Sequence, residues 1–277
     1  MTSSTRTLKS RLVHQLGILV ALLIATQAFA ATSVDQMLRA GGYDRQLQAS
    51  YAGVPEQFAL NFQQSSGLAL GQDIKELVEK SLSSKAIYEY TVNSLEAKLS
   101  ATQIDTTMAW LNSSLGRKIT ELEVSASHAD EMEKIAAQMN SILSDESKMK
   151  RGLEVDALLE ATDQSMAQIE MLQLATLTGM VGDRVTAEQF SAMKAQMTEA
   201  MQQAQPQIKR TTQAMVAYTY GSISDREYEE FLDYLKTPTS KALHKYITDA
   251  HTEVAQTQFE SLGRNISAYL EKTQSKQ

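Results

Sequence analysis

The chain contains no cysteine, and only three of its 277 residues are proline and twelve are glycine. The absence of cysteine excludes disulfide scaffolds, thiol nucleophiles, iron–sulfur clusters and cysteine-bound zinc. The scarcity of proline and glycine argues against a disordered, collagen-like or turn-rich β chain. With 43% hydrophobic and 21% charged residues, the composition is that of a globular protein.

Long apolar runs are also scarce, and the one near the N-terminus covers only residues 16–25. It is half the length of about 20 residues that a membrane-spanning helix needs. Three basic residues precede it, and the small residues Ala28 and Ala30 follow it. This order is typical of a signal peptide over residues 1–30 that is cleaved after Ala30, with an uncleaved anchor as the alternative. We therefore expect a periplasmic or secreted protein with no transmembrane segment after signal removal.

Basic residues are outnumbered by acidic ones. Removal of the signal peptide takes away three basic residues and leaves 23 Lys and Arg against 33 Asp and Glu, a formal charge of −10. Such a surface repels phosphate backbones and anionic lipid headgroups. We therefore expect neither nucleic acid nor a membrane surface as a partner.

Apolar residues recur at spacings of three and four after residue 31, whereas sustained apolar–polar alternation and Asn-Gly or Asp-Gly hairpin signals are absent. This pattern predicts an all-α fold, a helical bundle. The clearest stripe follows the i, i+3, i+4, i+7 rule of one helical face. It consists of Tyr228, Phe231, Leu232 and Leu235.

Capping signals predict a helix, a tight corner and a second helix over residues 223–246, which we call the second corner. Ser224 is a suitable N-cap, and Glu227 completes a capping box. Thr237 caps the next helix, and Pro238 takes its first position, where a missing N–H costs nothing. The second helix carries Leu243, Tyr246 and Ile247 inward.

A similar pattern lies 124 residues earlier, over residues 99–122, which we call the first corner. Ser100 and Gln103 form the expected capping box, and Ser113 is the second cap. The equivalent apolar stripe consists of Ile104, Thr107, Met108 and Leu111.

A second internal similarity links residues 34–40 with residues 155–161, at a displacement of 121. The two similarities predict a tandem duplication of one helical module. We place the first module at residues 31–147 and the second at residues 153–277, because Gly152 at the end of a charged stretch is expected to stop a helix. The modules either fold independently or share one core about a pseudo-twofold axis.

The two corners resemble the short motif of the bacterial domain-of-unknown-function 2059 family. That motif has Leu-Ser, an acidic or amide residue, two aromatic residues, Ser-Pro-x-Gly and a basic residue. The second corner fits it at Ile223, Ser224, Glu227, Tyr234, Thr237, Pro238 and Lys241. The first corner fits it at Leu99, Ser100, Gln103, Trp110, Ser113, Gly116 and Arg117.

Each corner also departs from the family motif. Ser240 stands in place of the glycine in the second corner, and Ser114 in place of the proline in the first. Leucines 111 and 235 replace the second aromatic residue. The resemblance covers about twenty residues per copy. It implies a secreted or periplasmic helical protein of unassigned activity, and it carries over no catalytic residue.

Trp110 and Tyr234 occupy equivalent places in the two corners. At 100° per residue each lies about 60° outside the apolar stripe of its helix. Aromatic residues at such an edge are candidate contacts with a ligand or partner. The simpler interpretation is that each covers the following helix of its own corner.

Met193, Met197 and Met201 share one helical face. Packing in the core is the simplest role for these flexible side chains. A partner surface and a Cu(I) site are the alternatives. Pro206 follows soon after and is expected to kink or end the helix.

Histidines and paired carboxylates complete the candidates. His244 and His251 are seven residues apart and favour a solvated face, because metal-binding pairs on helices are normally four apart. We predict no metal and no cofactor. Acidic pairs such as Glu229 with Glu230, or Asp156 with Glu160, fit solvated helical faces as well as they fit a hydrolase.

These observations favour a non-catalytic interaction or binding protein of the cell envelope. Its candidate contacts are Trp110, Tyr234, Met193, Met197 and Met201. An envelope hydrolase with paired carboxylates and a Met-based copper-handling protein are the alternatives. A cleft with two carboxylates would favour the hydrolase, and three sulfurs converging on one point would favour copper.

Overall fold

The computed structural model of the protein describes residues 32–56, 72–181 and 184–274. Within these ranges no residue belongs to a strand, so the predicted all-α fold is confirmed. Residues 34–277 form one compact unit, and of the preceding unit only Thr32 and Ser33 are described. The predicted signal peptide, residues 1–30, lies outside the described residues. In the described ranges no helix is both long and apolar enough to span a membrane.

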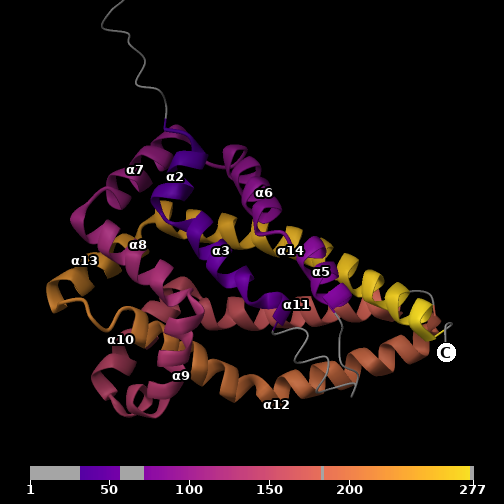
Figure 1. Ribbon diagram of the computed structural model, residues 1–277. Coiled ribbons are helices and arrows are strands. Elements are labelled where there is room, and N and C mark those ends of the chain that lie inside the picture. Colours follow the sequence, from indigo (N-terminus) through magenta and orange to yellow (C-terminus); the bar gives the residue numbers. More distant parts are fainter. Residues whose placement is uncertain (1–31, 57–71, 182–183, 275–277) are drawn as a thin grey trace, which may run out of the picture. The chain divides into compact units, whose positions relative to one another are not determined.

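The first half of the chain forms mostly short helices. They are α2 (Val34–Ala40), α3 (Tyr43–Ala52), α5 (Gln72–Ser81), α6 (Ser84–Glu96), α7 (Ala101–Leu111), α8 (Ser114–Ala126) and α9 (Ala129–Ser144). The second half forms α10 (Glu146–Leu159) and α13 (Asp225–Lys236), which are of similar length, and three longer helices, α11 (Ala161–Val181), α12 (Ala187–Thr219) and α14 (Pro238–Gln274). Helices α11 and α14 pack along each other, and α5 and α6 lie against α14 (Figure 1).

Both corners contain the capping contacts that start their helices. In the first corner, Ser100 and Gln103 form a complete capping box, and the Gly116 N–H donates to Ser113 Oγ. In the second corner, Ser224 and Glu227 form the same box. The Ser240 N–H donates to Thr237 Oγ1, and Pro238 is the first residue of α14. These caps satisfy backbone donors that a helix start leaves unpaired.

Two apolar clusters each draw on both halves of the chain. The first-half cluster combines residues of α2, α3 and α6 with Leu243 and Ala250 of α14. The second-half cluster combines residues of α10 and α13 with Leu115 and Ile119 of α8. The second helix of each corner, α8 or α14, therefore packs into the cluster of the other half. The two halves share their core.

The only positive φ angles in the described ranges occur where α2 turns into α3 and where α10 turns into α11. They belong to Gly42, with φ of 69°, and Glu160, with φ of 52°. The first helix of each half thus ends at a left-handed residue. The two residues are 118 positions apart rather than 121, so they are not equivalent in the proposed duplication, which stays a prediction.

Gly152 does not stop a helix, contrary to the prediction, although α9 ends where the charged stretch at residues 145–152 begins. Asp145 alone separates α9 from α10, and its carboxylate accepts a hydrogen bond from the Lys148 N–H. Gly152 lies buried inside α10. A Cβ at this position would lie 2.7 Å from the Cβ of Ala217 on α12. The glycine therefore permits two helices to approach closely.

Of the two outcomes expected at Pro206, a kink or an end of the helix, the end does not occur, since α12 continues to Thr219. A proline inside a helix removes one backbone hydrogen bond and costs about 3 kcal/mol. Packing on both sides of Pro206 offsets this cost, because Met201 before it and Ala214 and Ala217 after it are buried.

Candidate functional site

The aromatic side chains of the two corners meet each other. Trp110 of α7 and Tyr234 of α13 are stacked, with ring centroids 4.2 Å apart and ring planes within 8°. Phe231 extends the group, with its centroid 6.4 Å from that of Trp110. The stack joins the two halves of the chain, a contact that the sequence did not predict.

A cavity of about 200 Å³, which we call the central cavity, is lined by this stack. Most of its wall comes from the two corners, at positions that are 124 residues apart. The pairs are Thr107 with Phe231, Trp110 with Tyr234, Leu111 with Leu235, Ile119 with Leu243, Thr120 with His244, and Glu123 with Ile247. Helices α2 and α3 complete the wall with Met37, Leu38, Gly41, Tyr43 and Gln46.

Gly116 allows the first corner to be this tight. A Cβ at this position would lie 2.0 Å from the carbonyl oxygen of Trp110, which is far inside van der Waals contact. The equivalent residue of the second corner, Ser240, is fully buried. The glycine of the first corner is therefore a steric requirement that the second corner does not share.

Glu123 is the only carboxylate among the described residues that line the central cavity, and sequence reasoning missed it. Tyr220 Oη donates a hydrogen bond of 2.8 Å to Glu123 Oε1. Burial raises the pKa of Glu123 to about 7, although the hydrogen bond from Tyr220 acts in the opposite direction. Its counterpart in the second half, Ile247, lines the same cavity. The sequence feature that could have identified Glu123 is its alignment with Ile247, because an acid stands where the second half has an apolar residue.

His244 and His251 do not lie on a solvated face, contrary to the prediction. Burial lowers the pKa of His244 to about 4, and it also lowers the pKa of His251. The His251 ring lies 3.4 Å from the Tyr51 hydroxyl, measured from Nε2. The correction has a simple cause, because α14 packs against α3, α6 and α11 rather than exposing one broad face.

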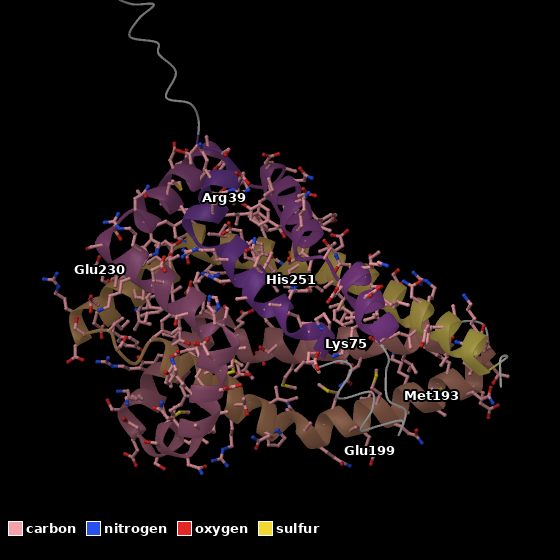
Figure 2. The ribbon with its side chains drawn as sticks, viewed as in Figure 1. Arg39, Lys75, Met193, Glu199, Glu230 and His251 are labelled. Carbon is pink, nitrogen blue, oxygen red and sulfur yellow. The ribbon has the colours of Figure 1, made fainter. Side chains whose placement is uncertain are left out.

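The methionine face does not join the central cavity. Met193 is exposed (Figure 2). Met197 is half-buried and Met201 is buried, so burial increases along α12. None of the three lines the central cavity, which therefore unites only Trp110 and Tyr234 of the predicted contacts. The described residues contain no group of three or more His, Asp or Glu side chains able to hold a metal ion.

The carboxylate pairs named from the sequence do not share a cleft. Glu229 and Glu230 are both exposed on α13, and Figure 2 shows Glu230. Asp156 is buried and accepts hydrogen bonds of 2.8 Å from both the N–H and the Oγ1 of Thr162. Gln213 Nε2 donates a third, at 3.3 Å. Asp156 thus holds the joint between α10 and α11 together, and its oxygens are occupied by this structural role.

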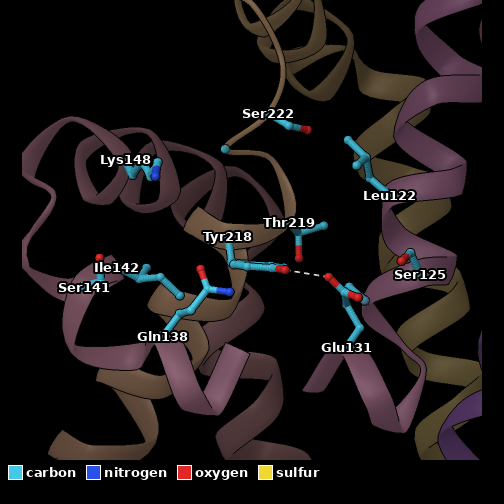
Figure 3. Close-up of a pocket in the computed structure, with 12 residues that line it drawn as sticks. Leu122, Ser125, Glu131, Gln138, Ser141, Ile142, Lys148, Tyr218, Thr219 and Ser222 are labelled. Atoms are coloured by element: carbon cyan, nitrogen blue, oxygen red, sulfur yellow. Dashed lines mark hydrogen bonds between the residues drawn. The ribbon is translucent and has the colours of Figure 1, made fainter. Parts of the chain in front are cut away.

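A second hollow, of about 400 Å³, lies between α8, α9 and the end of α12 (Figure 3). Its described lining is mostly polar, and its acidic residue is already paired. Glu131 accepts a hydrogen bond of 2.5 Å from Tyr218 Oη and forms an ion pair of 2.7 Å with Lys134. This hollow lacks the aromatic wall of the central cavity, which remains the stronger candidate for a binding site.

No family model matches the chain, and no curated protein or solved structure is detectably similar to it. The resemblance to the domain-of-unknown-function 2059 family therefore stays an expectation that rests on the residues of the two corners.

Proposed function

We propose that this chain is an exported, non-catalytic binding protein of the cell envelope that holds a small ligand in the central cavity. The observation that carries the proposal is the cavity itself, with apolar and aromatic walls and a few polar groups. This composition is characteristic of small-molecule sites. The export signal at residues 1–30 supports the location.

The volume of the central cavity sets the size of the ligand. Sites for drug-sized ligands usually enclose about 300–1,000 Å³, whereas this cavity encloses about 200 Å³. An apolar cavity of about 150 Å³ is enough to hold benzene. The expected ligand therefore has the size of a single substituted ring or a short branched chain.

Tandem duplication explains why the cavity lies where it does. If the two halves descend from one module, a pseudo-twofold axis passes between Trp110 and Tyr234, and the paired cavity positions face each other across it. Support comes from the six residue pairs of the lining, each 124 residues apart. The cavity is then the interface of an ancestral pair of modules, which is a common place for a binding site.

A non-catalytic role is favoured over a hydrolase by the distribution of acids. Hydrolysis of glycosidic bonds generally requires two carboxyl groups across one substrate. Glu123 is the only carboxylate that the described lining of the central cavity contains. The other named pairs are exposed or engaged in structural hydrogen bonds.

The proposal is tested with the fluorescence of Trp110, the only tryptophan of the chain. Titration with small neutral one-ring compounds such as benzyl alcohol is expected to give a saturable change in emission and a rise in melting temperature. The variant Ile247→Phe fills the cavity and is expected to abolish both effects. Leu153→Phe, at an exposed position of α10, is the matched control. Binding that survives Ile247→Phe, or no binding by any compound, would contradict the proposal.

A further inference from the structure

We infer that the ligand of the central cavity is a small organic cation, whose ammonium group pairs with the Glu123 carboxylate while its hydrocarbon part lies among the aromatic side chains. This inference rests on the proposed function and adds the chemical class of the ligand.

The first observation is that packing does not require an acid at position 123. Ile247 holds the equivalent position of the second half and lines the same cavity. An apolar side chain is therefore sufficient for packing at this position of the cavity wall. Glu123 is half-buried, and a carboxylate partly removed from water carries a desolvation cost that isoleucine avoids. Glu123 is explained if a ligand interaction offsets that cost.

The second observation is that the protein supplies no cation for Glu123. No Lys or Arg belongs to the described lining of the cavity, and of the described residues only Tyr220 hydrogen-bonds to this carboxylate. His244 lines the cavity as a neutral ring, because burial lowers its pKa to about 4. Lys118, on the same helix, is paired with Glu227 at 2.8 Å. A half-buried carboxylate without a cation is a site that an ammonium group completes.

The third observation is the aromatic wall. Trp110, Phe231 and Tyr234 form a continuous group that lines the cavity. Aromatic rings attract ammonium groups through their negative faces, and tryptophan does so most strongly. The excess of acidic over basic residues in the exported chain also attracts cations toward the molecule. Aromatic rings and one buried carboxylate together favour cations over neutral or anionic ligands.

The experiment compares probes of matched shape and different charge. Benzylamine, benzyl alcohol and benzoate are titrated into the purified protein at pH 8, where Glu123 is ionised because its pKa is about 7, and binding is followed by calorimetry and by Trp110 fluorescence. We expect benzylamine to bind at least tenfold more tightly than benzyl alcohol, and benzoate to bind more weakly than either. Equal binding of the amine and the alcohol would overturn the inference and leave the proposed function intact. Absence of binding by all three would overturn both.

The variant Glu123→Gln identifies the group that selects charge. Its preference for benzylamine over benzyl alcohol is expected to disappear, while its affinity for benzyl alcohol changes less than threefold. The control is Glu121→Gln on the same helix, whose side chain is 65% exposed and paired with Arg45 at 2.8 Å. It is expected to retain the wild-type preference. A preference for the amine that survives Glu123→Gln would overturn the inference, and the comparison of probes on the wild type needs no variant to fold.

Discussion

The first and second corners begin in the same way and continue differently. Each starts with a capping box and turns on a single hydroxyl cap. The second helix of the first corner, α8, has 13 residues, whereas that of the second corner, α14, has 37. Helix α14 keeps contacts with α6, α5 and α11 along its course, whereas α8 ends before a short turn at Ser127. Local sequence thus decides where a helix begins, and tertiary packing decides how far it continues.

The two corners also differ where they face the central cavity. The first corner has Gly116 where the second has Ser240. The residue directly after the first corner is Glu123, and the residue directly after the second is Ile247. The aromatic and aliphatic positions remain similar in kind. The differences therefore concentrate at one tight turn and at one buried charge, and each can be tested by changing a single residue.

The largest effect is expected for Gly116→Ala. The added methyl group would lie 2.0 Å from the Trp110 carbonyl oxygen, so the corner must open. We expect a loss of about 3 kcal/mol or more in the free energy of unfolding, measured by urea denaturation. Ser240→Ala removes a buried hydroxyl beside Tyr234, adds no atom, and is expected to cost about 1 kcal/mol or less. Equal losses for the two variants would show that the corners are not sterically different.

A somewhat smaller effect is expected from the charge of Glu123. Because its folded pKa is raised from 4.5 to about 7, the folded state retains a proton that the unfolded state has lost. The free energy of unfolding should therefore fall by roughly 2–3 kcal/mol as pH rises from 4.5 to 7. His244 and His251 act in the opposite direction, since burial lowers their pKa values.

The difference in free energy of unfolding between wild type and Glu123→Gln isolates the contribution of Glu123, because both proteins keep the two histidines. Tyr220 and Tyr234 face the same region and have raised pKa values, so neither ionises in this range. Denaturation across pH 4.5–7 should show wild type losing stability relative to the variant as pH rises. A constant difference would contradict the burial of this acid.

Stacking of Trp110 on Tyr234 is expected to stabilise the folded state by about 1 kcal/mol beyond the burial of the two rings. A double-mutant cycle with Trp110→Leu and Tyr234→Leu measures this coupling. The control cycle pairs Trp110→Leu with Tyr90→Leu, which lies on α6 and is 36% exposed. Coupling near zero in the first cycle would mean that the stack does not join the halves.

The smallest effects are expected at the caps. Ser100→Ala and Ser224→Ala each remove one side-chain acceptor from a helix start. Each variant should lose about 1 kcal/mol, measured as a lower melting temperature. An unchanged melting curve for either would show that its corner is held by packing alone.

The helix starts were predictable from the sequence because capping depends on residues three positions apart. Ser100 with Gln103, and Ser224 with Glu227, form the boxes that their spacing predicts. Helix ends were harder. Gly152 and Pro206 signal helix ends locally, yet both lie inside helices because neighbouring helices pack on either side of them.

The central cavity was only partly predictable. The equivalent positions of Trp110 and Tyr234 were visible as a displacement of 124 residues, but their contact depends on how the halves pack. The role of Glu123 was hidden for the same reason, since its burial arises from helices distant in sequence. The difference from Ile247 was present in the aligned corners and is the signal that points to this residue.

A crystal structure of the protein grown with benzylamine tests most directly whether the central cavity binds an organic cation. We predict that its nitrogen lies about 2.8 Å from a carboxylate oxygen of Glu123 and that its ring lies against the stacked side chains of Trp110 and Tyr234. A structure in which these two rings are apart, or in which the amine binds elsewhere and side chains fill the central cavity, would contradict the account.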